Sequence, residues 1–152
     1  MTNITLERNR LFLPALGAIY EKLSPLSWPL VRVTAGLLLV PHGYMKLFGG
    51  MEGLIGWFGQ IGFEPAALLA WYIALLEFVG GLMLAAGFLT RIVAAQIVGF
   101  MAVAAFGIHW GNGFLWTNGG YEYPLMWGAV ALAILFRGAG PLSVDARLGR
   151  EF

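Results

Sequence analysis

Four stretches of this sequence are long and apolar enough to cross a lipid bilayer as helices. They run over residues 29–48, 66–89, 92–111 and 121–136. The hydrocarbon core of a bilayer is about 30 Å thick, which a helix crosses in about 20 residues. In lipid every backbone polar group needs a partner within the chain, and no barrel-like alternation of short strands is visible. We therefore predict an all-α membrane protein, a bundle of four transmembrane helices.

The composition supports this class and excludes several others. Of the 152 residues, 59% are hydrophobic and 11% are charged, whereas about a quarter of a typical soluble domain is charged. A net charge of +1 provides no clustered basic face for nucleic acid. The chain has no cysteine, which rules out disulfides, iron–sulfur ligation and thiolate metal sites. Any redox role must therefore use another bound cofactor, a quinone or a partner.

Basic residues indicate which way the predicted bundle faces. Lysine and arginine are enriched on the cytoplasmic side of membrane proteins. Here they precede the first stretch, separate the second from the third and follow the fourth, at Arg8, Arg10, Lys22, Arg91, Arg137, Arg147 and Arg150. Near the opposite side the only basic residue is Lys46. Both termini are therefore expected in the cytoplasm.

Two cytoplasmic segments flank the predicted bundle of residues 29–137. Residues 1–28 precede it and residues 138–152 form a short tail. Residues 11–20 are as apolar as the core of a signal peptide, but Pro14 interrupts them and no small-x-small cleavage pattern follows. We expect residues 11–23 to form a helix lying in the membrane interface. In the tail, Ser143 is expected to cap a helical turn over residues 144–148, closed by Gly149.

The segment over residues 49–65 is rich in glycine and aromatic residues, too apolar for a free loop. It is expected to lie along the outer membrane surface. Small residues at helical spacing predict where the helices pack closely, since small side chains let two backbones approach. Such stripes are Ala70, Ala74 and Gly81, beside Glu77, in the second stretch and Ala95, Gly99 and Ala102 in the third.

Ionisable residues inside membrane spans are costly and are therefore candidates for function. At a rise of about 1.5 Å per residue, His42 and Glu77 lie about 20 Å from the cytoplasmic ends of their helices, and Glu122 lies at about 22 Å. Lys46 and His109 lie at about 26 Å on the same count. The sequence thus predicts one polar layer in the outer half of the bundle, with a residue from every helix.

Glu77 is the most informative member of this layer. A lone carboxylate in an apolar span is prohibitive, so Glu77 is either protonated or paired with His42, Lys46 or Arg32. The pair could fix the register of two helices, or it could handle protons. Arg32 lies only about 5 Å from the inner edge. It either extends to lipid phosphates or faces the bundle.

The two histidines allow two sharper hypotheses. His42 and His109 could ligate a b-type haem, or could bind copper with Met45 or Met101. Neither histidine belongs to a spaced ligand motif, so both hypotheses rank below a role in hydrogen bonding to a ligand or to the acids. We therefore predict no metal site.

Four motifs in this sequence resemble those of the DoxX family of small four-helix membrane proteins. They are His42-Gly43-x-x-Lys46-Leu47, Glu77-x-x-Gly80-Gly81-Leu82, Gly120-x-Glu122-Tyr123 and Gly138-x-Gly140-Pro141-Leu142-Ser143-x-Asp145. The resemblance runs over residues 29–149. The family takes its name from a subunit of a quinol oxidase or thiosulfate:quinone oxidoreductase, so the resemblance implies a protein of the bacterial inner membrane linked to oxidoreductase complexes.

The leading hypothesis is a quinone-interacting subunit of a membrane oxidoreductase. His42 or His109 would donate to a quinone carbonyl, Glu77 and Glu122 would relay protons, and Lys46 would stabilise an anionic form of the ring. Tyr72 and Trp110 would line the pocket. One alternative is a non-catalytic accessory subunit, docked in a larger membrane complex or a homo-oligomer. A weaker alternative is a carrier of a small hydrophobic solute, although no inverted repeat is visible.

Overall fold

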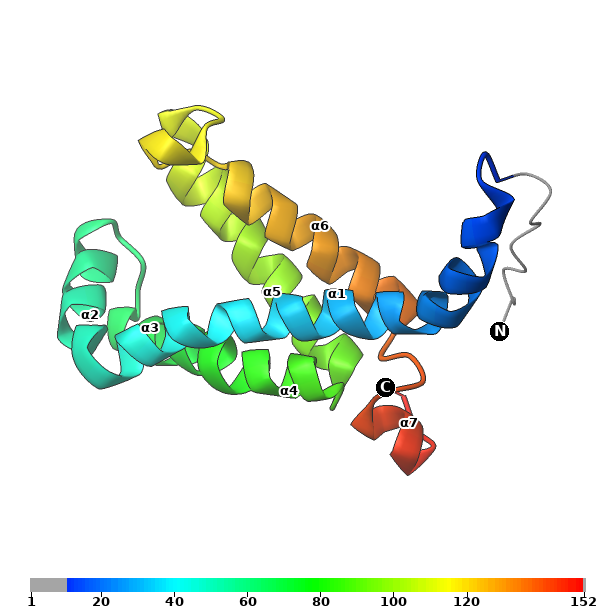
Figure 1. Ribbon diagram of the computed structural model, residues 1–152. Helices are drawn as coiled ribbons and strands as arrows, with labels where there is room; N and C mark the ends of the chain where they lie inside the picture. The colour runs from blue at the N-terminus through cyan, green and yellow to red at the C-terminus, as the bar shows by residue number, and fades with distance from the viewer. Residues whose placement is uncertain (1–10, 152) are drawn as a thin grey trace.

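The computed structural model describes residues 11–151, and every regular element in this part of the chain is helical (Figure 1). A short 3₁₀ turn, Pro14–Leu16, leads into the first α-helix. The α-helices are α1 (Gly17–Met45), α2 (Met51–Gln60), α3 (Ala66–Leu75), α4 (Gly81–Ala86), α5 (Thr90–Ala102), α6 (Glu122–Arg137) and α7 (Val144–Leu148).

Wider, π-helical turns connect several of these helices. Lys46–Gly50 joins α1 to α2, Leu76–Gly80 joins α3 to α4, and Val103–His109 extends α5. Three continuous helices, Pro14–Gln60, Ala66–Ala86 and Thr90–Asn112, are long and apolar enough to span a membrane. The all-α membrane class is therefore confirmed. Helix α6 matches the fourth predicted stretch, but with 16 residues it is shorter than these three helices, so the fourth crossing stays a prediction.

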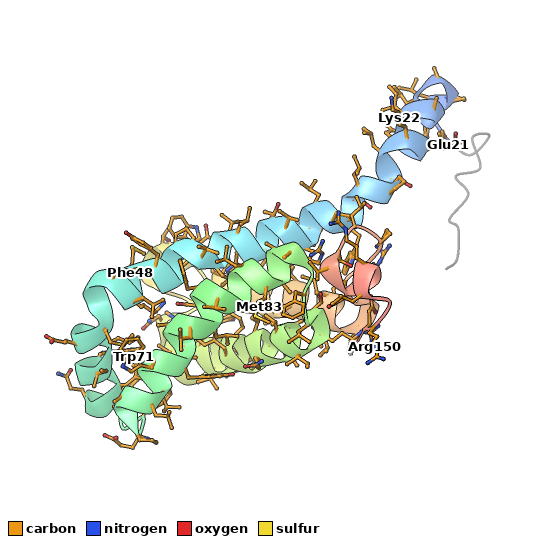
Figure 2. All side chains as sticks on the ribbon, turned by 90° about the horizontal axis from the view of Figure 1, so that it is seen from below. Glu21, Lys22, Phe48, Trp71, Met83 and Arg150 are labelled. Atoms are coloured by element: carbon orange, nitrogen blue, oxygen red, sulfur yellow. The ribbon has the colours of Figure 1, made fainter. Side chains whose placement is uncertain are left out.

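The first helix begins earlier than the predicted span. Helix α1 contains Pro25 and Pro29 near its start, and a proline inside a helix removes a backbone hydrogen bond and favours a kink. Figure 2 shows the part that carries Glu21 and Lys22 leading away from the bundle. The structure thus joins this segment to α1, and its place in the membrane interface stays a prediction. Arg8 and Arg10 lie outside the described residues.

The outer segment after α1 forms a helix of its own. Helix α2 packs against α3 through Phe58, which is buried with Ala66 and Ala70. Partly buried side chains such as Leu54 extend this cluster. The apolar side chains of this segment therefore pack against α3.

The helices form two tightly packed groups. The continuous helix Ala66–Ala86, which contains α3 and α4, is called the α3–α4 rod. Helix α1 runs along this rod, and α5 runs along α6. In Figure 1 the two groups lie close together near α7 and diverge toward the end that carries α2. A compact core, which includes Leu39, Leu84, Ile97 and Ile134, joins the groups.

The contact of α1 with α4 depends on glycine. A Cβ added at Gly36 would lie 2.5 Å from the carbonyl oxygen of Gly81 and 2.6 Å from the backbone nitrogen of Ala85. The stripe predicted on the second stretch is thus confirmed, with Ala70, Ala74 and Gly81 buried. On α5 the stripe prediction was wrong: Ala95, Gly99 and Ala102 are exposed. The face of α5 that is buried carries larger side chains, among them Ile97 and Met101, which cover more apolar surface.

The C-terminal tail closes the end of the bundle where the helix groups meet. Arg32 is 1% exposed and donates to the carbonyl oxygens of Leu84 (3.0 Å), Ala85 (2.8 Å) and Leu142 (2.6 Å). Arg32 therefore faces the bundle, and its extension to lipid phosphates is ruled out.

Asp145 completes this closure from α7. Its carboxylate accepts hydrogen bonds from the backbone nitrogens of Leu89 (2.9 Å) and Thr90 (3.0 Å) and from the Thr90 hydroxyl (2.7 Å). Ser143 caps α7 by accepting from the backbone nitrogen of Ala146, and Gly149 ends the helix with φ 67°. The predicted cap and stop of this turn are thus confirmed. The tail fastens α1 to the turn between α4 and α5.

Replacing Gly36 by alanine should separate α1 from α4. The added methyl group meets only backbone atoms, which cannot move aside, so we expect a loss of about 1–3 kcal/mol in the free energy of unfolding. Gly53→Ala in α2 is the matched control, because a Cβ there meets nothing within 4 Å. Unfolding in mixed detergent micelles measures both. Equal stability of the two variants would contradict the close contact.

Asp145→Asn should loosen the C-terminal tail. The amide group brings two N–H donors toward a site that already holds three donors, and the expected cost is about 2 kcal/mol. Limited proteolysis should then cut the tail more quickly than in the wild type. The exposed Arg147 of the same helix provides the control, Arg147→Gln, whose tail should be cut at the wild-type rate.

Candidate functional site

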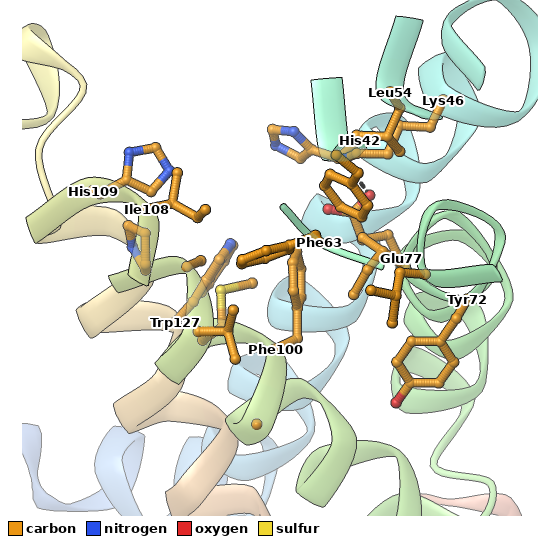
Figure 3. Close-up of a pocket in the computed structure, with 18 of the residues that line it drawn as sticks. His42, Lys46, Leu54, Phe63, Tyr72, Glu77, Phe100, Ile108, His109 and Trp127 are labelled. Carbon is orange, nitrogen blue, oxygen red and sulfur yellow. Dashed lines mark hydrogen bonds and ion pairs between the residues drawn. The ribbon is translucent and has the colours of Figure 1, made fainter. Parts of the chain in front are cut away.

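A cavity of about 950 Å³ lies between the two helix groups at the end where they diverge. Side chains from α1, α2, α3, α5 and α6 line it, most of them apolar or aromatic (Figure 3). Its volume falls in the range of about 300–1,000 Å³ that is typical of sites for small molecules. The polar side chains on its wall are few, as in such sites.

Lys46 and Glu77 form an ion pair on the wall built by α1 and the α3–α4 rod. Glu77 is 4% exposed, whereas the Lys46 side chain is 25% exposed. Of the partners that the sequence left open for Glu77, the structure thus selects Lys46. Because each charge compensates the other, the pair is tolerated in apolar surroundings.

Gly43 brings the two partners within reach of each other. A Cβ at this position would lie 2.3 Å from the backbone nitrogen of Phe78 and 2.8 Å from the carbonyl oxygen of Ala74. Helix α1 therefore presses directly on the turn that carries Glu77. His42 lines the same cavity one helical turn before Lys46. One close approach of two backbones thus explains why a glycine stands at position 43 and why Lys46 reaches Glu77.

His109 lines the cavity from the other helix group. Its Nδ1 atom lies 2.6 Å from the carbonyl oxygen of Gly119, and the side-chain amide of Asn112 donates to the same oxygen at 3.1 Å. Figure 3 shows His109 across the cavity from His42 and Glu77. The two histidines therefore belong to opposite walls.

Three of these ionisable residues lie in π-helical turns. Lys46 begins one, Glu77 is the second residue of another, and His109 ends the third. A π-helical turn holds one residue more than an α-helical turn, so it rotates the side chains that follow, and such turns are frequent at functional sites. The backbone is thus irregular where the cavity is polar.

Two predicted contact residues do not line the cavity. Glu122 accepts a hydrogen bond from the backbone nitrogen of Trp116 at 3.1 Å, and Trp110 stacks on Tyr121 with ring centroids 4.6 Å apart. Trp110 belongs to the outer segment that follows α5, and Glu122 is the first residue of α6. Because Glu122 bonds to the backbone of the outer loop instead, equal depth along each helix does not bring all five ionisable residues together.

Tyr72 does line the cavity, as predicted, and the structure adds residues that sequence reasoning missed. The hydroxyl of Tyr72 donates to Oε1 of Gln96 at 3.1 Å. Gln96 and Glu64 also line the cavity. Gln96 is an amide inside an apolar stretch, and this signal could have revealed it. Within residues 11–151, no group of three or more His, Asp or Glu side chains could hold a metal ion.

Comparison with known proteins agrees with the motifs in the sequence. The sequence model of the DoxX family matches residues 27–110. A Bacillus subtilis protein named "Putative oxidoreductase CatD" is 33% identical over 105 residues, which cover 69% of this chain and 75% of that protein. An uncharacterized Haemophilus influenzae protein is 30% identical over 134 residues, 86% of this chain and 97% of its own length. No solved structure matches.

The family match includes the motifs around Lys46 and Glu77 and all the cavity-lining residues from Leu39 to His109. It covers more than half of the chain, and the relatives align over much of the remainder. This chain is an integral membrane protein that belongs to the DoxX family.

Proposed function

We propose that this protein is a quinone-interacting subunit of a membrane oxidoreductase system. The observation that carries the proposal is the Lys46–Glu77 ion pair, which borders a large cavity with apolar and aromatic walls. A pair that served only to align two helices would need no such cavity beside it. The name of the Bacillus subtilis relative, an oxidoreductase, supports the same class of activity.

The chemistry of the cavity suits a quinone ring. A quinone presents two carbonyl oxygens on a flat apolar ring, so its site needs aromatic walls and a donor for an oxygen. Phe63, Phe100 and Trp127 supply aromatic surface, and Lys46 supplies N–H donors. Glu77 holds the lysine in place and can exchange a proton with it.

The proposal includes the placement of the chain in the bacterial inner membrane. Helix α6 forms the fourth span, because it packs against the apolar α5 and ends in Arg137. Arg91, Arg137 and Arg147 then lie on the cytoplasmic side, as the enrichment of basic residues predicts. The cavity opens toward the outer half of the membrane, and the C-terminal tail closes the inner end.

A carrier role is disfavoured by the same closure. A carrier must open its site to each side in turn, whereas here the buried Arg32 and Asp145 fasten the helices together at one end. The accessory-subunit alternative shares the ion pair with our proposal but makes no use of the cavity. Binding of a quinone therefore separates the two.

Glu77→Gln should weaken quinone binding by about tenfold or more, because Lys46 loses its charged partner and hydrogen bonds to charged groups contribute about 1.5–3 kcal/mol. Binding of a short-chain ubiquinone or menaquinone to the purified protein is measured by quenching of tryptophan fluorescence. Glu52→Gln is the matched control, since Glu52 is exposed on α2 and does not line the cavity.

The double variant Lys46→Met, Glu77→Gln is the control for misfolding of the single variant, because it leaves neither charge of the pair without its partner. It should keep a cooperative unfolding transition and should also lose quinone affinity. If the folded double variant binds quinone as well as the wild type, the ion pair serves only the architecture and the proposal fails.

Cysteine labelling should reveal one-sided access, since the natural chain has no cysteine to interfere. Ala104 lines the cavity, so Ala104→Cys should react with a membrane-impermeant thiol reagent added outside intact cells. The exposed Arg147 of α7 provides Arg147→Cys, which should react only in inverted vesicles. Reaction of both variants from the same side would contradict the proposed topology.

A further inference from the structure

The hydrogen bond of His109 determines which of its ring nitrogens carries the proton. Nδ1 lies 2.6 Å from the carbonyl oxygen of Gly119, and a carbonyl oxygen can only accept. Nδ1 must therefore donate, and in a neutral imidazole Nε2 then bears the lone pair. His109 thus brings a hydrogen-bond acceptor to its wall of the cavity.

The outer loop is built to hold that carbonyl oxygen in place. Gly119 has φ 72°, in the left-handed region where glycine is favoured. A Cβ at Gly120 would lie 2.3 Å from the carbonyl oxygen of Gly113, so the loop closes tightly beside it. Glu122 binds the backbone of Trp116 from the start of α6. Glu122 does not line the cavity. The Gly120-x-Glu122 motif is therefore explained by its role in the structure of the outer loop.

Asn112 acts on the same oxygen. Its side-chain amide donates to the Gly119 carbonyl at 3.1 Å, beside the bond from His109. The two donors use both lone pairs of the carbonyl oxygen and so fix its orientation. A carbonyl held in this way keeps the histidine in one tautomer. Asn112 is therefore a positioning residue for His109.

The two walls of the cavity differ in hydrogen-bonding character. Lys46, held by Glu77, offers N–H donors on the α1 wall. With Nδ1 donating to Gly119, the neutral form of the His109 ring offers Nε2 as an acceptor on the α5 wall. A quinone has only acceptor oxygens and leaves Nε2 without a partner, whereas a hydroquinone can donate a hydroxyl proton there and accept from Lys46 at its other oxygen.

We propose that the cavity binds the reduced, hydroquinone form of its ligand in preference to the quinone, with a phenolic hydroxyl donating to Nε2 of His109, and that Asn112 and the Gly119 carbonyl set this preference. The inference rests on the proposed quinone-interacting function. It assigns the ligand's redox form and adds Asn112 and the loop to the site.

Nitrogen NMR of protein labelled with ¹⁵N-histidine tests the tautomer directly, because the chain has only two histidines. The His42→Gln variant assigns the remaining signals to His109. We expect a neutral ring with Nδ1 protonated, and a shift of the Nε2 signal when a short-chain ubiquinol is added under reducing conditions. A ring protonated on Nε2 alone would overturn the inference.

Binding of the two redox forms tests the preference. Ubiquinol should bind more tightly than the matching ubiquinone, by up to about tenfold, since one hydrogen bond to Nε2 of His109 is gained. His109→Ala should abolish this ratio, because it removes the acceptor on which the preference depends. Asn112→Ala should reduce the ratio and mix the tautomers in the NMR spectrum, whereas Asn118→Ala, exposed in the same loop, should do neither.

The outcomes separate this inference from the function on which it rests. Equal affinity of the wild type for both redox forms would overturn the hydroquinone preference and leave the quinone-interacting function intact. If neither form binds, both are wrong.

Discussion

Charged groups that cannot reach water need partners inside the bundle, and this requirement governs the structure at both of its ends. At one end Lys46 and Glu77 join α1 to the α3–α4 rod as an ion pair. At the other, Arg32 donates hydrogen bonds to three backbone carbonyls, and Asp145 accepts hydrogen bonds from the backbone at the start of α5. In lipid no hydrophobic effect draws helices together, so these polar contacts and the close glycine contacts determine how the helices meet.

The two ends differ in what surrounds their charges. Around Arg32 and Asp145 the packing is close, and Gly87 has no room for a side chain, because a Cβ would lie 2.2 Å from Nη1 of Arg32. Around Lys46 and Glu77 the helix groups diverge and leave a cavity. A bundle that is fastened at one end and open at the other can hold an apolar ligand without unfolding any helix. This asymmetry makes the open end the candidate site.

Prediction from the sequence was most accurate where a residue's role depends on its neighbours along one helix. The all-α membrane class, the buried stripe of Ala70, Ala74 and Gly81, and the cap of α7 at Ser143 followed from periodicity and local chemistry. Estimates of depth also brought His42, Lys46, Glu77 and His109 into one layer, and all four line the cavity. They failed for Glu122, because depth along a helix contains no information on the direction in which a side chain points: the next residue, Tyr123, lines the cavity, whereas Glu122 bonds to the loop backbone. The buried face of α5 was missed for a related reason: small residues mark a possible contact, and the neighbour decides which face is used.

The sequence by itself determined that this chain forms apolar helices, which residues carry charge within them, and that no cysteine chemistry is available. These properties are local, set by composition and by the period of the helix. Only the tertiary structure decided that Glu77 pairs with Lys46, that Arg32 is enclosed by the tail, and that His109 donates to Gly119. Each of these contacts joins segments that are separate along the chain or that follow an irregular turn. Their geometry depends on how the helices cross and on π-helical turns, which rotate the side chains that follow them. The sequence reveals neither the crossing nor the rotation.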